Sequence, residues 1–275
     1  MDDLGQIAGA AFSDETGAEV PTPSRRHTPT VAAEVLNRMH RGSAPEEILA
    51  DTILGQYPGG VALVSSFGAD SAVLLHMVSR IDPALPVLFL ETGMLFPETL
   101  AYQRRLAAEL GLTDVRLVRP AADDLAAEDP DGRLHGTDPD RCCAIRKTLP
   151  LRRALAPFDA WITGRKRAQA ETRAGMAVFE PEDGTGRVKV NPLADWDLRR
   201  VRAHIEAWDL PRHPLVAKGY PSIGCAPCTT RVRPGEDPRA GRWRGREKIE
   251  CGIHFDGTRW VRTPPGAAGV VSSFP

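Results

Sequence analysis

The sequence predicts an α/β protein built on a doubly wound parallel sheet. Two observations indicate this fold class: short apolar runs that are typical of strands buried on both faces, and helix-like stretches between them that are long enough for crossover connections. A third observation is size, because 275 residues of which 42% are hydrophobic can build a sizeable core. In such a sheet, ligands bind at the carboxyl ends of the strands.

The predicted elements follow one another in a regular order. Residues 1–28 are rich in Ala, Gly, Pro, Ser and Thr and show no apolar period, so we expect a flexible leader there. Helices with one apolar face are predicted at 31–36 and 45–54, because apolar residues recur three and four positions apart. The alternating part then comprises strands at 61–64, 87–90, 115–118 and 160–163, with helices at 72–78, 98–110 and 142–155 between them.

Regular structure thins toward the C-terminus. After an apolar run at 188–193, one more helix is predicted at 197–208, whereas residues 229–275 carry many Gly, Pro and Arg residues. We therefore expect one domain over residues 29–235 and a mobile or loosely docked tail over 236–275.

Composition and charge exclude several classes of function. The 35 basic and 36 acidic side chains give a formal charge of −1, which does not support a nucleic-acid or membrane-surface role for the whole protein. No segment approaches the roughly 20 apolar residues that span a bilayer. The start Met1-Asp2-Asp3 lacks the basic residues of a signal peptide. We expect a cytoplasmic protein without a nucleic-acid or membrane partner.

The five cysteines favour metal binding or catalysis over disulfides, because the cytoplasm keeps thiols reduced. Cys142 and Cys143 are adjacent, Cys225 and Cys228 form a CxxC motif, and Cys251 stands alone. Four soft thiolates suit either zinc or an iron–sulfur cluster. Adjacent cysteines fit zinc knuckles badly, whereas a 4Fe–4S cluster spreads its ligands more widely, so the pattern favours the cluster. The CxxC motif also resembles a thioredoxin active site but lacks the early βαβ unit of that fold.

A second motif follows the first predicted strand. Residues 65–71, with the sequence Ser-Ser-Phe-Gly-Ala-Asp-Ser, combine small and hydroxylated residues at a strand-to-helix turn, where backbone N–H groups can bind a phosphate or sulfate. The alternative is a plain turn in which Asp70 or Ser71 caps the following helix.

This loop resembles the phosphate-binding loop of the adenine nucleotide α-hydrolase superfamily, whose pattern is Ser-Gly-Gly-x-Asp-Ser. Phe67 replaces the first Gly, and a side chain there takes up space beside the phosphate. The variant is similar to the loop of adenylyl sulfate and phosphoadenylyl sulfate reductases, which do not split ATP, and the resemblance covers nearly all of residues 55–255. It implies an adenine nucleotide α-hydrolase-like fold and nucleotide binding by Ser65, Ser66, Phe67 and Gly68.

Two further loops extend the resemblance. Residues 90–99 are similar to the second nucleotide loop of the family, which is commonly Asp-Thr-Gly and here contains Glu91, Thr92 and Gly93. Residues 163–173 are similar to the family's arginine loop and imply substrate contacts from Gly164, Arg165 and Arg173. Four cations within nine residues suit a doubly anionic ligand, although they also fit a solvated basic face or an RNA-binding patch.

The cysteines carry the most specific part of the resemblance. In this family a Cys-Cys pair with a CxxC motif marks members that bind a 4Fe–4S cluster and mostly use adenylyl sulfate. Members that act on the 3′-phosphorylated substrate generally lack these cysteines. Lys147 matches a family lysine between cluster and substrate, and Glu250-Cys251-Gly252-Ile253-His254 is similar to a Glu-Cys-Gly-Leu-His signature. Arg239 and Arg242 match arginines that meet the anionic end of the substrate.

The resemblance implies a thioredoxin-dependent reductase that converts adenylyl sulfate to sulfite and AMP in sulfate assimilation. Cys251 would attack sulfur, and Arg239, Arg242, Lys147 and His254 would stabilise the charge that develops. Thioredoxin or a similar dithiol would then release sulfite. The alternatives are a phosphoadenylyl sulfate reductase, an ATP pyrophosphatase of the same superfamily, and a cluster-bearing sensor or RNA-binding protein. The sequence leaves the oligomeric state open, a homo-oligomer included.

Overall fold

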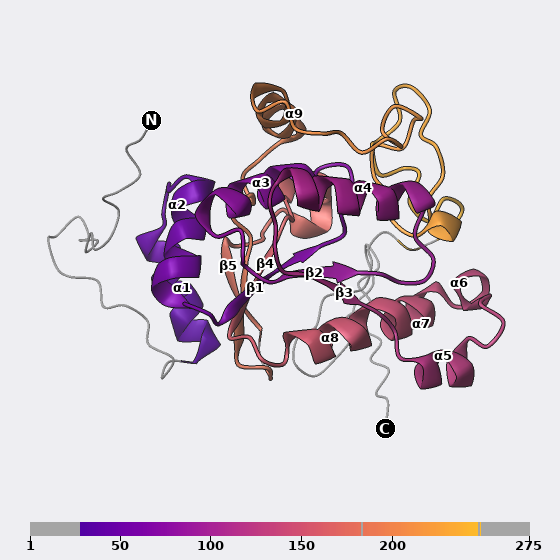
Figure 1. The fold of residues 1–275 in the computed structure, drawn as a ribbon, viewed down its shortest axis with the longest axis horizontal. Coiled ribbons are helices and arrows are strands. Elements are labelled where there is room, and N and C mark those ends of the chain that lie inside the picture. The colour runs from indigo at the N-terminus through magenta and orange to yellow at the C-terminus, as the bar shows by residue number, and fades with distance from the viewer. Residues whose placement is uncertain (1–27, 183, 247, 249–275) are drawn as a thin grey trace, which may run out of the picture.

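A six-stranded sheet with helices on both faces forms the centre of the protein (Figure 1). The structure is a computed structural model that describes residues 28–182, 184–246 and 248. The strand order is β3-β2-β1-β4-β6-β5. The strands are β1 Val61–Ser65, β2 Val87–Leu90, β3 Val115–Val118, β4 Ala160–Thr163, β5 Phe179–Glu182 and β6 Arg187–Val190.

The sheet has its topological switch point between β1 and β4, where successive strands begin to be added on the opposite side of β1. The chain runs outward from β1 through β2 to β3, and then returns to place β4 on the other side of β1. Both neighbours pair with β1 in parallel, so that Leu63 lies beside Val87 on one side and Ile162 on the other. A crevice forms at such a switch point because the flanking crossovers leave in opposite directions. The loops after β1 and β4 border that crevice.

The helices cover the sheet in two layers. In Figure 1, α3 and α4 lie on one face and α7 and α8 on the other. The helices are α1 Pro29–Met39, α2 Pro45–Ala50, α3 Ser71–Ile81, α4 Pro97–Glu109, α5 Ala122–Glu128, α6 Leu134–Thr137, α7 Pro139–Cys143, α8 Leu149–Leu155 and α9 Leu198–Ala207. Two π-helical segments, η1 Asp51–Gln56 and η2 Ala144–Thr148, and three 3₁₀ turns, η3 Arg167–Gln169, η4 Glu171–Arg173 and η5 Ala226–Cys228, complete the set. Within the described ranges, none of the helices is long and apolar enough to cross a membrane.

The core follows from the alternation of side chains along the strands. In β2, Val87 and Phe89 point into the larger apolar cluster under α3, whereas Leu88 and Leu90 join a smaller cluster under α8. Strands covered on both faces need apolar residues at every position, which is why they appear as uninterrupted apolar runs.

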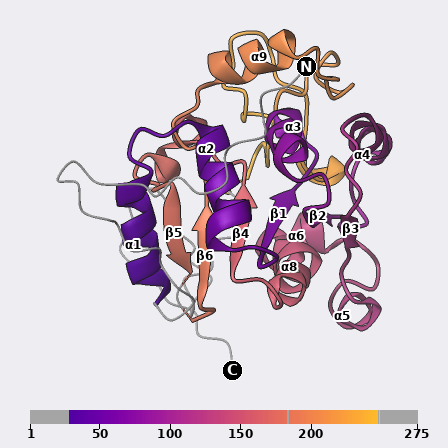
Figure 2. The ribbon, with the colours of Figure 1, turned by 60° about the vertical axis from the view of Figure 1, so that its left-hand side comes forward.

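Two strands differ from expectation. β3 was expected to be buried on both faces, but it is an edge strand on which Arg116 and Leu117 are exposed. β5 was not predicted at all; it pairs antiparallel with β6 and is the other edge. Pro181 is compatible with an edge strand because it has no N–H to donate. The doubly wound parallel sheet is therefore confirmed, with one antiparallel strand added. Figure 2 shows β5 running opposite to β1.

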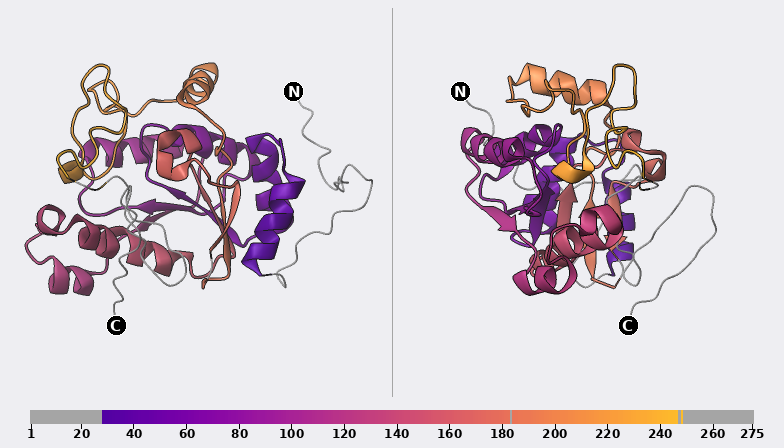
Figure 3. Two further views of the ribbon diagram at one scale, coloured as in Figure 1. Left: turned by 180° about the vertical axis from the view of Figure 1, so that it is seen from behind. Right: turned by 90° about the vertical axis from the view of Figure 1, so that its right-hand side faces the viewer.

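The segment after α9 packs beyond the carboxyl ends of the strands. Leu95, in the loop after β2, forms a bridge with Cys225, and Ala226 N–H donates to the Met94 carbonyl at 2.8 Å. Thr229 in turn forms a bridge with Arg242. The described residues beyond 229 are thus docked rather than loosely attached (Figure 3, orange to yellow). The predicted leader over 1–28 lies outside the described residues except for its last position.

Candidate active site

A cavity of about 440 Å³ opens at the switch point of the sheet. Its walls come from the loops after β1, β2 and β4, from α9 and from the segment after α9. Ten of the predicted site residues line it: Ser65, Ser66, Gly68, Thr92, Lys147, Gly164, Arg165, Arg173, Arg239 and Arg242. These ten residues come from five segments that are distant in sequence, and they share one site.

The loop after β1 leads directly into α3. Phe67 N–H donates to the Ser65 hydroxyl at 3.1 Å, and Ser71 N–H donates to the Gly68 carbonyl at 3.2 Å. Asp70 occupies the N-cap position, but its side chain makes no capping hydrogen bond. Its carboxylate accepts instead from Lys166 Nζ at 3.2 Å. The first turn of α3 thus keeps backbone N–H groups that can donate to an anion, as the N-termini of phosphate-binding helices do.

Phe67 does not act as the sequence indicated. Its ring is fully buried, does not line the cavity and packs edge-on against Phe89 with 5.1 Å between the ring centroids. The backbone reaches this position with φ of 46°, in the left-handed region that non-glycine residues rarely adopt. The side chain therefore does not take up space beside a phosphate; it anchors the loop in the core.

Glu91 and Gly93 shape their loop without lining the cavity. Glu91 Oε1 accepts from Gly93 N–H at 2.7 Å, and Oε2 accepts from Arg119 at 3.0 Å. Thr92, between them, lines the cavity, as does Leu95 later in the loop.

Cations gather in the cavity at high density. Lys166, Lys189, Arg202 and Arg212 line it in addition to the predicted cations. Lys189 is buried beside Trp161, with Nζ 5.1 Å from the ring centroid, and burial lowers its pKa, as does nearby Arg165. Lys166 belongs to the predicted basic loop, and Lys189 alternates with valines in a strand. Nothing in the sequence places Arg202 or Arg212 at the site.

Helix α7 carries Cys142 and Cys143 and leads into the segment that contributes Lys147 to the cavity. Asp138 caps the helix, accepting from Asp140 N–H at 3.1 Å and Arg141 N–H at 2.9 Å. The predicted single helix over 142–155 is divided here, because η2 begins directly after Cys143 and Leu149 N–H bonds to the Ala144 carbonyl. Such π-helical segments occur frequently at functional sites. This one carries Arg146 and Lys147, both buried.

The cysteines of two distant segments influence one another electrostatically. Burial, together with the neighbouring Cys143 and Cys225 thiols, raises the pKa of the Cys142 thiol to about 12. Burial also raises the pKa of Cys228, as does Cys225, whereas the charges of Lys147, Arg246 and Arg242 lower it.

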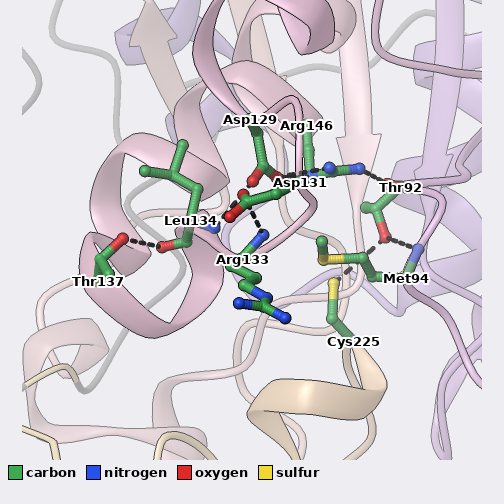
Figure 4. Close-up of polar contacts among 9 residues, drawn as sticks. All are labelled: Thr92, Met94, Asp129, Asp131, Arg133, Leu134, Thr137, Arg146 and Cys225. Carbon is green, nitrogen blue, oxygen red and sulfur yellow. Dashed lines mark hydrogen bonds and ion pairs between the residues drawn. The ribbon is translucent and has the colours of Figure 1, made fainter.

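A chain of hydrogen bonds joins the two cysteine segments (Figure 4). Arg146 donates to the Thr92 carbonyl at 3.0 Å and to Asp129 through Nε at 3.0 Å and Nη2 at 2.5 Å. The Thr92 hydroxyl accepts from Met94 N–H at 3.2 Å and forms a second hydrogen bond with Cys225 Sγ, 3.3 Å away. One loop therefore touches both cysteine segments and the cavity.

The four described cysteines supply thiol donors that a metal centre could use, but their side chains are not arranged around a single ion. In the part of the chain that the structure describes, no three His, Cys, Asp or Glu side chains converge as one bound ion requires. Buried thiols whose pKa values are raised by burial and by each other need positive charge to ionise. Buried Arg146 and Lys147 supply part of it, and a bound metal centre would supply the rest.

Cys251 and His254 lie outside the described residues. Lys248, three positions before Cys251, donates to the Pro139 carbonyl at 3.2 Å and to Asp140 at 2.5 Å. The chain is thus held at the start of the helix that carries Cys142 and Cys143.

The switch-point cavity, the anion loop and the row of cations define a nucleotide-binding protein of the adenine nucleotide α-hydrolase type. Comparison with known proteins gives the family. Residues 60–231 match the phosphoadenosine phosphosulfate reductase domain, and the chain belongs to this family.

Named relatives and solved structures agree with this assignment. The chain is 56% identical over 199 residues to an adenosine 5′-phosphosulfate reductase of Chelativorans sp. (strain BNC1), covering 72% of this chain and 80% of that protein. It is 45% identical over 224 residues to a phosphoadenosine 5′-phosphosulfate reductase of Gloeobacter violaceus, covering 80% and 92%. The crystal structure of a phosphoadenylyl-sulfate reductase from Candida auris, a phosphate complex, superposes with a TM-score of 0.61 at 27% identity, covering 74% and 97%.

Proposed function

We propose that this protein reduces adenylyl sulfate to sulfite and AMP in sulfate assimilation, with thioredoxin or a similar dithiol as reductant. The observation that carries the proposal is the position of Lys147. This buried lysine lines the nucleotide cavity and also acts on the pKa of Cys228, so the cysteine group and the cavity share a wall. The relative from Chelativorans, named for this substrate, supports it.

The reaction divides into a displacement and a reduction. The Cys251 thiolate attacks the sulfur of bound adenylyl sulfate, a Cys251 S–S bond forms, the bond between sulfur and the phosphate oxygen breaks, and AMP leaves with the electron pair. Negative charge collects on the sulfonyl and phosphate oxygens during this step. Arg239 and Arg242, which line the cavity, Lys147 and His254 are the groups that we assign to its stabilisation.

The second step restores the thiol. A thiolate of the dithiol protein attacks Cys251 Sγ, and sulfite leaves with the electrons of the Cys251 S–S bond. The second thiol of the reductant then resolves the mixed disulfide, which returns Cys251 as a thiol and oxidises the reductant to its disulfide. Sulfur is reduced by two electrons and the dithiol supplies both. This dependence on reduced thiols suits a cytoplasmic location.

We assign Cys142, Cys143, Cys225 and Cys228 as ligands of a 4Fe–4S cluster. When bound, such a group supplies a fixed anionic centre of thiolate and sulfide beside the cavity. Lys147 then lies between two anions, and its charge attracts both the cysteine group and the substrate. Arg146 and Thr92 hold the ligand loops in place through the hydrogen bonds described above.

A second candidate substrate is the 3′-phosphorylated form of adenylyl sulfate. The relative from Gloeobacter violaceus is named for it, and the cavity carries more cations than a doubly charged ligand needs. Sulfite release from each substrate, measured with a thioredoxin system, separates the two. Preference for adenylyl sulfate is expected. Equal or better turnover of the 3′-phosphorylated compound would reject that specificity, and ATP turnover without sulfite would reject the reductase itself.

A further inference from the structure

Gly224 leaves the space that the Arg242 guanidinium occupies. A Cβ built on Gly224 would overlap Nη2 and Cζ of Arg242 and lie 3.1 Å from its Nε. The backbone at Gly224 is not in the left-handed region, so the backbone conformation itself would accept an alanine. The three atoms nearest to the added Cβ all belong to the Arg242 side chain.

The backbone of Gly224 cannot shift easily to relieve such an overlap. Its N–H donates to the Thr229 hydroxyl at 3.2 Å, and that hydroxyl donates to the Cys225 carbonyl at 2.9 Å. The next residue, Cys225, pairs with Leu95 in the loop after β2. Arg242, in contrast, approaches Gly224 with the far end of a flexible side chain. A methyl group at Gly224 would therefore move the guanidinium and leave the fold in place.

The position of Arg242 is defined on its other sides as well. Nη1 donates to the Ile223 carbonyl at 3.3 Å, and Cζ lies 4.5 Å from the ring centroid of Trp243. Gly224 and Arg242 both line the cavity, next to Ile223 and Gly68 of the phosphate loop. The guanidinium is thus seated between the cysteine segment and the nucleotide loop.

A nearby glycine provides a contrast. A Cβ on Gly241 would overlap the backbone carbonyl of Thr230, and a backbone group cannot move aside as a flexible side chain can. The Gly241 carbonyl also accepts a hydrogen bond from Thr230 N–H at 2.9 Å. Substitution there would disrupt the docking of the whole segment. Substitution of Gly224 would disturb one functional side chain.

We propose that Gly224 is a positioning residue for the reaction, because it provides the seat from which Arg242 meets the anionic end of the substrate. This inference rests on the proposed role of Arg242. A guanidinium moved by a methyl group would meet the sulfate or phosphate oxygens out of alignment, and misplacement of about 1 Å can lower a rate about 100-fold. The cysteines would keep their contacts.

A double-mutant cycle tests this proposal. Four proteins, the wild type, Gly224→Ala, Arg242→Ala and the double variant, are purified with their cluster, and AMP release from adenylyl sulfate is measured in the first turnover. Gly224→Ala is expected to slow AMP release about 10- to 100-fold and to keep the visible absorption. In the Arg242→Ala background the same change should alter the rate less than about twofold, because the overlapping side chain is gone.

A matched control and a second readout keep the outcomes distinct. Gly175→Ala, where a Cβ would meet nothing within 4 Å, should react at the wild-type rate. Gly224→Ala could also lose the visible absorption of the cluster. If the double variant retains that absorption, the cluster measurement by itself supports an overlap between the new methyl group and Arg242. Equal losses of rate or absorption in both backgrounds would overturn the inference and leave the reductase proposal intact. A wild-type rate in Arg242→Ala would overturn the proposed role of Arg242 and the inference with it.

Discussion

At the scale of single residues, Asp129 is the buried acid that holds the loops around the cysteines. Its side chain is inaccessible, accepts two hydrogen bonds from Arg146 and accepts the Leu134 N–H at 2.8 Å. Asp129→Ala would leave a buried guanidinium without its counter-charge. We expect the free energy of unfolding to fall by about 3–5 kcal/mol, measured by denaturant titration.

The control for this prediction is an exposed ion pair. Asp124 pairs with Arg153, whose side chain is 57% exposed, so Asp124→Ala should cost less than about 1 kcal/mol. Similar losses for the two variants would show that the Arg146 pair does not hold the site together.

The sequence predicted the chemistry of the site better than its geometry. Lysines and arginines in short motifs indicated anion binding, and the cavity brings most of them together, whereas the described cysteines lie outside its lining. The direction of the Phe67 ring and the contribution of Lys189 could not be predicted, because both depend on neighbours across the sheet. Phe67 packs on Phe89 of β2, and Lys189 lies beside Trp161 of β4.

At the scale of elements, His213 joins α4 to the segment that leads to the cysteines. Its Nδ1 accepts from Leu215 N–H at 3.2 Å, so Nε2 carries the proton and donates to the Thr99 hydroxyl at 3.0 Å. Tyr102, also on α4, donates to the Pro211 carbonyl at 2.8 Å. Burial lowers the pKa of His213 to about 4.

This lowered pKa predicts a loss of stability in acid. The unfolded chain binds a proton at His213 below about pH 6.5, whereas the folded protein binds it only near pH 4. The contribution of neutral His213 to folding stability is therefore complete above pH 6.5 and declines as the pH falls toward 4. The unfolding temperature should therefore drop more between pH 7 and pH 5 for the wild type than for His213→Gln. Parallel curves for the two proteins would contradict the assignment.

The elements themselves were predictable to different degrees. β2, β3 and β4 have the predicted bounds. β2 and β4 are buried on both faces and give apolar runs with clear ends. β5, with the sequence Phe-Glu-Pro-Glu, has no such pattern. It exists through pairing with β6 and through Asn37 of α1, which donates to the Phe179 carbonyl at 2.7 Å and accepts from its N–H at 3.0 Å. Contacts of this kind are not visible in a local sequence window.

At the scale of the whole molecule, the proposal assigns four cysteines to a cluster and one to chemistry. The protein purified without air should be brown, because iron–sulfur clusters bound by thiolates absorb in the visible range. Cys228→Ser should lose this absorption, whereas Cys251→Ser should retain it. Colourless protein that contains one zinc ion per chain would contradict the cluster assignment.

The most direct test of the account is the mass of the peptide that contains Cys251. Wild-type protein incubated with adenylyl sulfate and no thioredoxin should gain about 80 Da on this peptide, the mass of an SO3 adduct on the nucleophile. Reduced thioredoxin should then remove the adduct and release sulfite, and Cys251→Ser should form no adduct and lose turnover. An adduct on another cysteine, or turnover by Cys251→Ser, would contradict the mechanism.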